Sequence, residues 1–245
     1  ARWRSRRDVL ATMQRATRLT VCSRYQQGLA RIPGGHPEVI PLGVDTGFFR
    51  PASQAAAPET ALPSRSFRLL HVGRLNAVND QATLIEAFRL LLHREPQARL
   101  DIAGDDDLSG STQALAHRLG VGPHVTFHGS QDRAQLLALY QRADLFVLSP
   151  RHEASGMAVM EAAACGVATV GTAVGYVVEL APYAAVAVPP CEPSALAGAI
   201  AETLMGGLKR ARIAAAARAW AAAHDAAWTA GQFDRVYQEL AAAGR

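Results

Sequence analysis

Residues 67–103 are FRLLHVGRLNAVNDQATLIEAFRLLLHREPQARLDIA, and they contain the pattern from which the fold follows. The runs 67–72 and 98–103 are short and apolar, as expected of buried strands. Between them, residues 80–93 have the periodicity of an amphipathic helix. Its apolar side consists of Leu84, Ile85, Phe88, Leu91 and Leu92. Two strands joined by a helix of this length predict a parallel crossover unit.

The same alternation continues to about residue 205. Further helical patterns lie at 111–119, 132–142, 156–165 and 193–205, and further short apolar runs at 124–127, 144–149, 167–170 and 185–188. Parallel strands need crossover connections, whose helices cover both faces of the sheet. We therefore predict an α/β fold with a doubly wound, parallel, Rossmann-like sheet.

The two flanks have a different pattern. Residues 18–31 contain a strand, LTVCS, and a short helix, and a turn-rich stretch separates them from the later sheet. At the other end, 208–224 and 226–241 are predicted as helices. The last one carries the apolar residues Trp228, Phe233, Val236, Tyr237 and Leu240. Because this surface is large for a terminal helix, we expect it to pack against another part of the protein.

The composition is that of a globular protein. Of the 245 residues, 49% are hydrophobic and 19% are charged, which excludes wholesale disorder. No apolar run approaches the roughly 20 residues of a membrane-spanning helix. The three cysteines lack C-x-x-C spacing, which argues against a zinc site and favours reduced thiols. We expect a soluble, cytoplasmic chain.

The positive charge is concentrated at the start of the chain. Residues 1–18 carry six Arg and one Asp, a balance of +5, so that within the net charge of +4 the remainder of the chain sums to −1. A nucleic-acid-binding protein usually spreads positive charge over its folded body, so we expect no nucleic-acid partner. The apolar residues Trp3, Val9, Leu10 and Met13 form a partial helical stripe. We expect a solvated helix face at a domain edge, and a targeting or membrane-surface segment is the alternative.

Ligands of such sheets bind beyond the carboxyl ends of the strands, near helix N-termini. The first of these loops contains Gly73, which permits close backbone approach, and Arg74, whose guanidinium matches phosphate oxygens. Surface arginines are common, so this pair alone is a weak indication of a phosphate site.

The loop and helix SPRHEASGMAVMEAAACG (149–166) are more specific. Glu153 precedes the helix that begins near Gly156, and Glu161 leans back toward that helix start. Helix N–H groups there suit a phosphate, and the two carboxylates suit neutral hydroxyl groups, a combination found in a nucleotide sugar. The alternative is that Glu161 is a solvated helix position and that the alanines after it only pack tightly.

Other motifs fit less well. GVATVGT (166–172) has the glycine spacing of a P-loop without its lysine, and no G-x-G-x-x-G occurs. Asp105–Asp107 form a D-x-D pattern, but the position for a bidentate calcium ligand is Ala116. A polar loop that caps the helix at 111–119 explains the acidic residues more simply. We expect no metal.

The order and spacing of several stretches resemble the donor-binding, C-terminal lobe of a family-4 retaining glycosyltransferase of the two-lobed B fold (GT-B). The matching stretches are VCSRY (21–25), VIPLGVDTGFFRP (39–51), HVGRLN (71–76), TLIEAF (83–88), ARLDIAGD (98–105), VTFHGS (125–130), ADLFVLSP (143–150), the E-x7-E block from Glu153 to Glu161, and AVGYVVE (173–179).

This resemblance implies roles for individual residues. Arg74, beside Gly73, would contact the donor diphosphate, Glu153 would hold hydroxyls of the transferred sugar, and Glu161 would bind the ribose. The residues implied to surround the sugar and phosphates with backbone groups are Ser155, Gly156, Met157, Ala158 and Val159. Those that match the base-binding edge are Gly104, Asp105, Gly129 and Ser130. Glu153 and Arg74 are thus the implied catalytic residues.

The resemblance also implies an organisation and a mechanism. Residues 1–45 would be the end of an N-terminal lobe and a linker, 46–225 the nucleotide-sugar-binding domain, and 226–245 a helix that packs toward the N-terminal lobe. Such enzymes transfer a hexose with retention, without metal or cofactor, by stabilising the leaving diphosphate. The missing lobe or a partner chain would complete the enzyme, so the chain alone would be inactive, and a lipid acceptor would imply peripheral membrane contact.

The chain departs from the family pattern at Asn79, where a donor-binding lysine is usual. The loss of one charge-assisted contact is worth roughly 1.5–3 kcal/mol, so we expect weak donor binding or compensation by another arginine such as Arg151. The alternative function is a degenerate or split lobe that binds a nucleotide or supports a partner domain. A sugar-nucleotide epimerase of the same fold is a third possibility.

Overall fold

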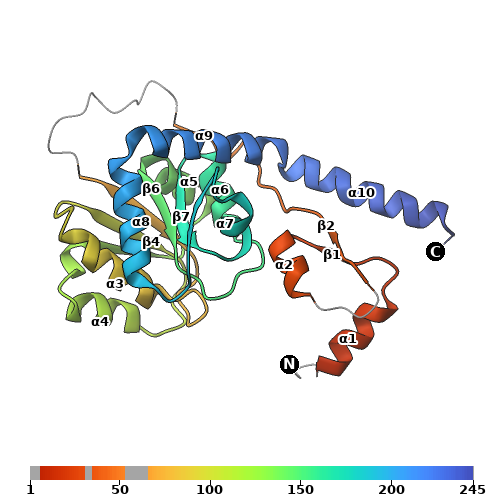
Figure 1. The fold of residues 1–245 in the computed structure, drawn as a ribbon, viewed down its shortest axis with the longest axis horizontal. Helices are drawn as coiled ribbons and strands as arrows, with labels where there is room; N and C mark the ends of the chain where they lie inside the picture. Colours follow the sequence, from red (N-terminus) through yellow and green to blue (C-terminus); the bar gives the residue numbers. More distant parts are fainter. Residues whose placement is uncertain (1–5, 31–34, 53–65, 245) are drawn as a thin grey trace.

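The structure, a computed structural model, describes residues 6–30, 35–52 and 66–244 (Figure 1). Its main sheet has six strands, all parallel, in the order β5-β4-β3-β6-β7-β8. The strands are β3 (Arg68–Val72), β4 (Arg99–Ala103), β5 (Val125–Gly129), β6 (Leu145–Leu148), β7 (Thr169–Thr172) and β8 (Val186–Val188). The predicted parallel α/β sheet is confirmed. Arg2, Trp3 and Arg4 of the arginine-rich start lie outside the described residues.

The chain reverses direction across the sheet between β3 and β6. From β3 it moves outward to β4 and β5, then returns to β6 beside β3 and continues outward to β7 and β8. The loops after β3 and β6 therefore diverge from neighbouring strand ends, which is where open α/β sheets bind their ligands.

Helices cover both faces of the sheet (Figure 1). They are α3 (Gln81–Leu92), α4 (Ser111–Arg118), α5 (Arg133–Arg142), α6 (Met157–Ala164), α7 (Gly175–Leu180), α8 (Pro193–Met205) and α9 (Gly207–Ala223), with a 3-10 turn at Gly122–His124. Side chains of successive strand residues enter opposite cores: Leu69 packs with α3 and α8, and Leu70 with α5 and α6. The predicted apolar side of α3 is buried, except that Leu92 is only partly so.

Two elements differ from the prediction. The strand expected at 167–170 begins at Thr169, because Gly166 and Val167 terminate α6. The N–H of Gly166 donates to the Ala163 carbonyl and that of Val167 to the Ala162 carbonyl, with Gly166 at φ 74°. The six-residue helix α7 has no counterpart in the prediction.

The flanking segments form a separate layer. β1 (Thr20–Val21) and β2 (Glu38–Val39) make a two-stranded parallel sheet. Helix α2 (Arg24–Leu29) lies between these two strands in the sequence. The terminal helix α10 (Ala226–Ala242) projects from the sheet domain and contacts the chain after β2 (Figure 1). Thr229 Oγ1 donates to the Pro41 carbonyl at 2.8 Å, and Arg235 pairs with Glu38.

Of the apolar residues predicted on α10, Val236 is buried and Tyr237 is exposed. The contacts with Pro41 and Glu38 join α10 to the segment around β2, and the division into lobes stays a prediction. None of the helices in the described parts of the chain is both long enough and apolar enough to cross a membrane.

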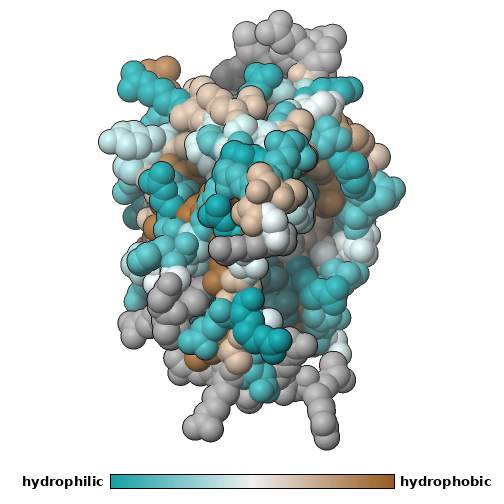
Figure 2. All heavy atoms as spheres, turned by 90° about the vertical axis from the view of Figure 1, so that its right-hand side faces the viewer, coloured by the Kyte–Doolittle hydropathy of each residue, from teal (hydrophilic) through white to brown (hydrophobic). Residues whose placement is uncertain are grey.

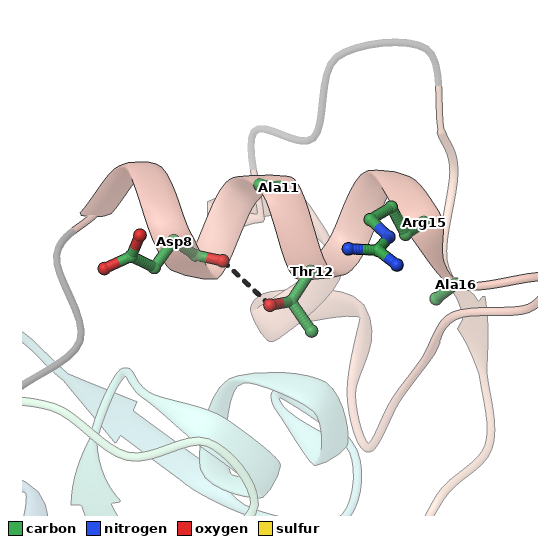
Figure 3. Close-up of a pocket in the computed structure, with 5 residues that line it drawn as sticks. All are labelled: Asp8, Ala11, Thr12, Arg15 and Ala16. Atoms are coloured by element: carbon green, nitrogen blue, oxygen red, sulfur yellow. Dashed lines mark hydrogen bonds between the residues drawn. The ribbon is translucent and has the colours of Figure 1, made fainter.

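Helix α1 (Arg6–Arg15) lies at the edge of the molecule, near α2 (Figure 1). A hollow runs along it, lined by Asp8, Ala11, Thr12, Arg15 and Ala16 (Figure 3). All five come from this helix and its end, and Thr12 Oγ1 donates to the Asp8 carbonyl at 2.8 Å. On this side of the molecule hydrophilic residues predominate, with hydrophobic ones in small groups (Figure 2). A membrane role for α1 stays untested.

The carboxyl ends of β3 and β4 approach each other closely at two glycines. Gly104 has φ 148°, and a Cβ at this position would lie 2.1 Å from the carbonyl oxygen of Gly73. Glycine is therefore required at position 104 by both backbone conformation and space. This contact fixes where the loop after β3 leaves the sheet.

We expect Gly104→Ala to destabilise the protein by about 3 kcal/mol or more, because the added methyl group collides with backbone that cannot rotate away. The matched control is Gly198→Ala in α8, where a Cβ meets nothing within 4 Å. That substitution should raise stability by about 0.5–1 kcal/mol. Urea unfolding of both variants measures the difference, and equal stabilities would contradict the close approach.

Candidate functional site

A pocket of about 300 Å³ opens where the chain reverses between β3 and β6. It is lined by His71, Val72, Gly73, Asn79, Leu136, Leu148, Pro150, Glu153, Gly156, Met157, Ala158 and Glu161. The loops after β3 and β6 and the start of α6 thus meet around one cavity. Its volume lies at the lower end of the range for ligand pockets, roughly 300–1,000 Å³.

Glu153 is fixed by the backbone of its own loop. Its Oε1 accepts hydrogen bonds from the N–H groups of Ala154 at 2.9 Å and Ser155 at 3.3 Å. The Ser155 carbonyl in turn accepts from the N–H of Tyr176 at 2.8 Å. These bonds hold the carboxylate at the rim of the pocket without a cationic partner.

Glu161 lies inside the pocket rather than on a solvated helix face. Its Oε2 accepts a hydrogen bond from the hydroxyl of the fully buried Tyr140 at 2.8 Å. Burial raises the pKa of the Glu161 carboxyl above its usual value, against the opposing effects of Tyr140 and Arg133. The interpretation of Glu161 as a merely solvated position is wrong, although Ala162, Ala163 and Ala164 do pack in the core as that alternative held.

The start of α6 is open toward the same cavity. Gly156 adopts φ 81° at the N-cap and supplies no side-chain cap to the first turn. The residues that follow, Met157 and Ala158, line the pocket, whereas Val159 is buried behind them. Helix N-terminal N–H groups favour anions, so this end of the pocket suits a phosphate.

A buried hydrogen-bond network below the pocket holds the loop after β3. His71 Nδ1 donates to the Val147 carbonyl at 3.0 Å, so its neutral ring accepts at Nε2 from Gln81 Nε2 at 3.1 Å. Gln81 Nε2 also donates to the Arg74 carbonyl at 3.0 Å, and its oxygen accepts from the Asn76 N–H. The side-chain amide of Gln81 therefore connects the loop after β3, at Arg74 and Asn76, to His71 of the sheet.

The sequence patterns alone do not single out His71, Gln81 or Tyr140. The signal for His71 was its place between Leu70 and Val72 in a run predicted as a buried strand, where a polar side chain needs a partner. Desolvation lowers the pKa of His71 from 6.5 to about 4. It is therefore neutral near pH 7.

Arg74 lies beside the pocket, but its guanidinium contacts two acidic residues of the next loop. Nη1 is 3.0 Å from Asp107 Oδ1 and Nη2 is 3.6 Å from Asp105 Oδ2, with all three side chains about half exposed. Asp105 and Asp107, the two aspartates of the D-x-D pattern, thus pair with Arg74. Asp106 between them accepts hydrogen bonds from the N–H groups of Leu108 and Gly110, just before α4.

Asn79 lines the pocket, and its Nδ2 donates to the Arg74 carbonyl at 2.6 Å. Arg151, the expected substitute for the missing lysine, pairs instead with the buried Asp80 through Nε at 2.9 Å. None of the described residues that line this pocket is Arg or Lys. The compensation expected from Arg151 has no support in this geometry.

The remaining predicted residues lie outside the pocket lining. Gly104 and Gly129 meet where their strands end, with the Gly104 N–H donating to the Gly129 carbonyl at 2.8 Å. Asp105 contacts Arg74, and Ser130 is exposed after β5. Ser155 contacts α7 through its carbonyl. The structure thus gathers Gly73, Asn79, Glu153, Glu161 and the α6 start, and leaves the predicted base-binding edge beside them.

The described residues contain no group of three or more His, Cys, Asp or Glu side chains that could hold a metal ion. Glu153 and Glu161 line the pocket, whereas Asp105 and Asp107 pair with Arg74. The chemistry that this pocket offers is therefore hydrogen bonding by carboxylates and binding of an anion at a helix start.

Comparisons with known proteins agree on one family. A sequence model described as glycosyl transferases group 1 matches residues 34–220. A D-inositol 3-phosphate glycosyltransferase of Segniliparus rotundus is 36% identical over 143 residues, which is 56% of this chain and 32% of that protein. One of Xylanimonas cellulosilytica is 31% identical over 227 residues, 86% of this chain and 52% of that protein. The chain thus spans about a third to a half of the curated relatives it matches.

Solved structures show the same fold. A sucrose-phosphate synthase from Thermosynechococcus elongatus superimposes with a TM-score of 0.83 at 26% identity, over 97% of this chain and 61% of that one. HepE of Anabaena, solved in complex with UDP and glucose, gives 0.82 at 22% identity, over 95% of this chain and 66% of that one. The predicted similarity to GT-B glycosyltransferases is confirmed at the level of fold.

The neutral His71 makes stability depend on pH in a defined direction. The unfolded chain binds a proton at His71 below pH 6.5, and the folded chain only below about 4. In that window, stability should fall as pH is lowered, by at most about 1.4 kcal/mol per pH unit. His71→Gln removes this contribution, so its free energy of unfolding should fall less steeply with decreasing pH than that of the wild type.

Urea unfolding at several pH values between 6.5 and about 4 measures the two slopes. His117→Gln, an exposed position on α4, is the matched control and should keep the wild-type slope. Parallel curves for the wild type and His71→Gln would show that His71 titrates alike in the folded and unfolded states.

Proposed function

The chain belongs to the glycosyl transferases group 1 family, and we propose that it is the donor-binding lobe of a retaining hexosyltransferase of family 4. In this proposal, the pocket between β3 and β6 binds a nucleoside-diphosphate sugar. A second lobe, on the same or a partner chain, supplies the rest of the acceptor site, so that the present chain alone does not turn over.

One observation carries the proposal: two carboxylates and an open helix N-terminus line the same pocket. The diphosphate would lie against the N–H groups at the start of α6, near Met157 and Ala158. Glu161 would accept from the ribose hydroxyls, and Glu153 from hydroxyls of the transferred hexose. Carboxylates close to a phosphate would repel it, so in this proposal they face the neutral hydroxyl groups of the ribose and the hexose.

Arg74 would change partners when the donor binds. Its ion pairs with Asp105 and Asp107 are exposed, and such pairs contribute about 0–1 kcal/mol. Contacts of arginine with phosphate are charge-assisted and often bidentate, hence stronger. The diphosphate can therefore draw Arg74 away from the two aspartates at little cost.

The proposed reaction is a transfer with retention. The bond between the anomeric carbon and the diphosphate breaks, and the electron pair leaves with the diphosphate oxygen. The acceptor oxygen bonds to the oxocarbenium-like carbon on the same face, and its proton passes to the departing diphosphate. Stabilisation of the leaving group by the α6 start and Arg74 then lowers the barrier, without a metal ion or cofactor.

A lobe that has lost donor binding is not favoured, because both carboxylates and the α6 start remain arranged around a cavity. A sugar-nucleotide epimerase would use the same donor, and detection of transfer to an acceptor separates the two functions. A lipid acceptor would bring the enzyme to a membrane surface. We propose a cytoplasmic location, where nucleotide sugars are formed.

Binding of a nucleoside diphosphate tests the proposal directly. We expect one of UDP, GDP, ADP, CDP or dTDP to raise the thermal midpoint, since a ligand at 100 times its Kd adds about 2.7 kcal/mol of stability. Glu161→Gln should weaken that nucleotide about tenfold by removing a charged acceptor of ribose hydroxyls. Glu86→Gln, on the exposed side of α3, removes the same charge elsewhere and should change nothing.

EDTA should leave this stabilisation unchanged. If none of the five nucleotides stabilises the wild-type chain, the donor site is wrongly assigned. Equal affinities in Glu161→Gln and Glu86→Gln would refute the ribose role of Glu161.

None of the described residues that line the pocket is Arg or Lys, so a cation added there should strengthen the binding of a diphosphate. Asn79→Lys should strengthen nucleoside-diphosphate binding about ten- to a hundredfold, because it adds a charge-assisted contact to the phosphates. Ala82→Lys, exposed on the first turn of α3, adds the same charge outside the pocket and serves as the control. Isothermal titration measures both variants, and equal affinities would mean that Asn79 does not face the diphosphate.

A further inference from the structure

A separate pocket of about 240 Å³ lies between the starts of α3 and α4, and we call it the α3–α4 pocket. It shares none of its described lining residues with the pocket between β3 and β6. Leu115 of its lining packs on the core beneath α3 and α8, whereas Leu136 of the other pocket packs on the core beneath α5 and α6. The two pockets therefore belong to opposite faces of the sheet.

The guanidinium of Arg151 lines the α3–α4 pocket and gives it a cationic group. Its Nε donates to Asp80 Oδ2 at 2.9 Å, and the backbone N–H of Arg151 donates to the Val78 carbonyl at 2.8 Å. The side chain is 54% exposed, and within the described parts of the chain neither Nη atom is hydrogen-bonded. The N–H groups of both Nη atoms are therefore available to a ligand.

Thr112 contributes a hydroxyl group that lacks a partner. The residue lines the pocket and is 4% exposed, and its hydroxyl makes no hydrogen bond to any described residue. Because a buried polar group without a partner costs free energy, this hydroxyl indicates that the pocket receives a hydrogen-bonding ligand.

The start of α4 adds further donors beside Thr112. Gly110 is the N-cap residue and supplies no side-chain cap to the first turn, and the exposed Ser111 lines the pocket. The N–H groups at a helix N-terminus carry a partial positive charge and favour an anion. This helix end, the Thr112 hydroxyl and Arg151 lie around one pocket, and all three favour the same kind of ligand.

The carboxylates near the pocket are already engaged by donors of the protein. Asp80 is 5% exposed, and its Oδ2 accepts from the Thr83 hydroxyl at 2.9 Å as well as from Arg151. Asp106, which precedes α4, accepts from two backbone N–H groups and from a side-chain amide. The polar groups of Arg151, Thr112 and Ser111 that face the pocket are therefore donors to an incoming oxygen atom.

We propose that the α3–α4 pocket binds a phosphate group, either as the free ion or as part of a small phosphorylated molecule. The oxygens of the phosphate accept hydrogen bonds from the Arg151 Nη groups, from the hydroxyls of Ser111 and Thr112, and from the first turn of α4. A volume of about 240 Å³ favours a small ligand, since pockets for larger organic ligands measure roughly 300–1,000 Å³. This site does not rest on the proposed function.

Two-dimensional ¹⁵N NMR of the 245-residue chain, titrated with inorganic phosphate at constant ionic strength, tests the site. We expect the backbone amide signals of Ser111, Thr112 and Gln113 to shift with phosphate and to stay in place with sodium chloride. A second titration with glycerol 3-phosphate separates the two sources of the phosphate group. Tighter binding of the ester indicates a phosphorylated molecule, and tighter or equal binding of phosphate indicates the free ion.

Two variants test the proposed contacts separately. Thr112→Val removes the hydroxyl with little change of shape and should weaken phosphate binding about fivefold. Arg151→Gln combined with Asp80→Asn removes the guanidinium without leaving a buried carboxylate unpaired, and should weaken binding at least tenfold. Thr126→Val, at an exposed position of β5, is the matched control and should keep the wild-type affinity.

Shifts at the start of α4 that need more phosphate in both variants support the site. The proposal is overturned by absence of these shifts in the wild type, by equal shifts with chloride, by shifts confined to Met157 and Ala158 of α6, or by wild-type affinity in either variant. Urea unfolding checks that each variant is folded, and Thr112→Val decides alone if the double variant is not. Binding of nucleoside diphosphates in the other pocket is measured independently of all these outcomes.

Discussion

Parallel pairing of β3 with β6 places two loops from distant parts of the sequence against each other. The pairing joins Leu69 to Leu145 and Leu70 to Phe146, and the chain leaves these two strands on opposite sides of the sheet. Gly73 follows one strand and Pro150 the other, so the cavity forms because neither connection can cover the strand ends. The carboxylates, the α6 start and Asn79 all depend on this one reversal of direction for their proximity.

The charges around the cavity are unusual for a site that would bind a diphosphate. Two carboxylates line the pocket, while Arg74, in the loop after β3, is engaged by Asp105 and Asp107. The energy scales make this arrangement workable, because exposed ion pairs are worth about 0–1 kcal/mol and hydrogen bonds to charged groups about 1.5–3 kcal/mol. In the proposed complex, anion binding would depend mainly on backbone N–H groups, which no side-chain substitution removes.

Much of the fold could be predicted from sequence, because apolar runs such as 67–72 and the helical side containing Leu84 and Phe88 record burial directly. The six-residue α7 could not, since it is too short for periodicity and begins at Gly175, where contact with Ser155 leaves no room for a side chain. In the site, the proximity of Glu153 and Glu161 followed from helix geometry. The partners of Arg74 and Gln81 did not, because side-chain hydrogen bonds between loops leave no periodic trace in a sequence.

Glu153 lies where the pocket between β3 and β6 meets an adjoining pocket. The sheet domain and α2 contribute differently to these two pockets. The described residues that line the pocket between β3 and β6 all belong to the sheet domain, from His71 to Glu161, whereas α2 contributes Tyr25, Gln26 and Leu29 to an adjoining pocket. The Glu153 loop is tied to α2 through Ser23 and to α7 through the Ser155 carbonyl. Substitutions in α2 can therefore alter the lining of the adjoining pocket and leave most of the lining of the pocket between β3 and β6 unchanged, although the two pockets share Asn79 and Glu153.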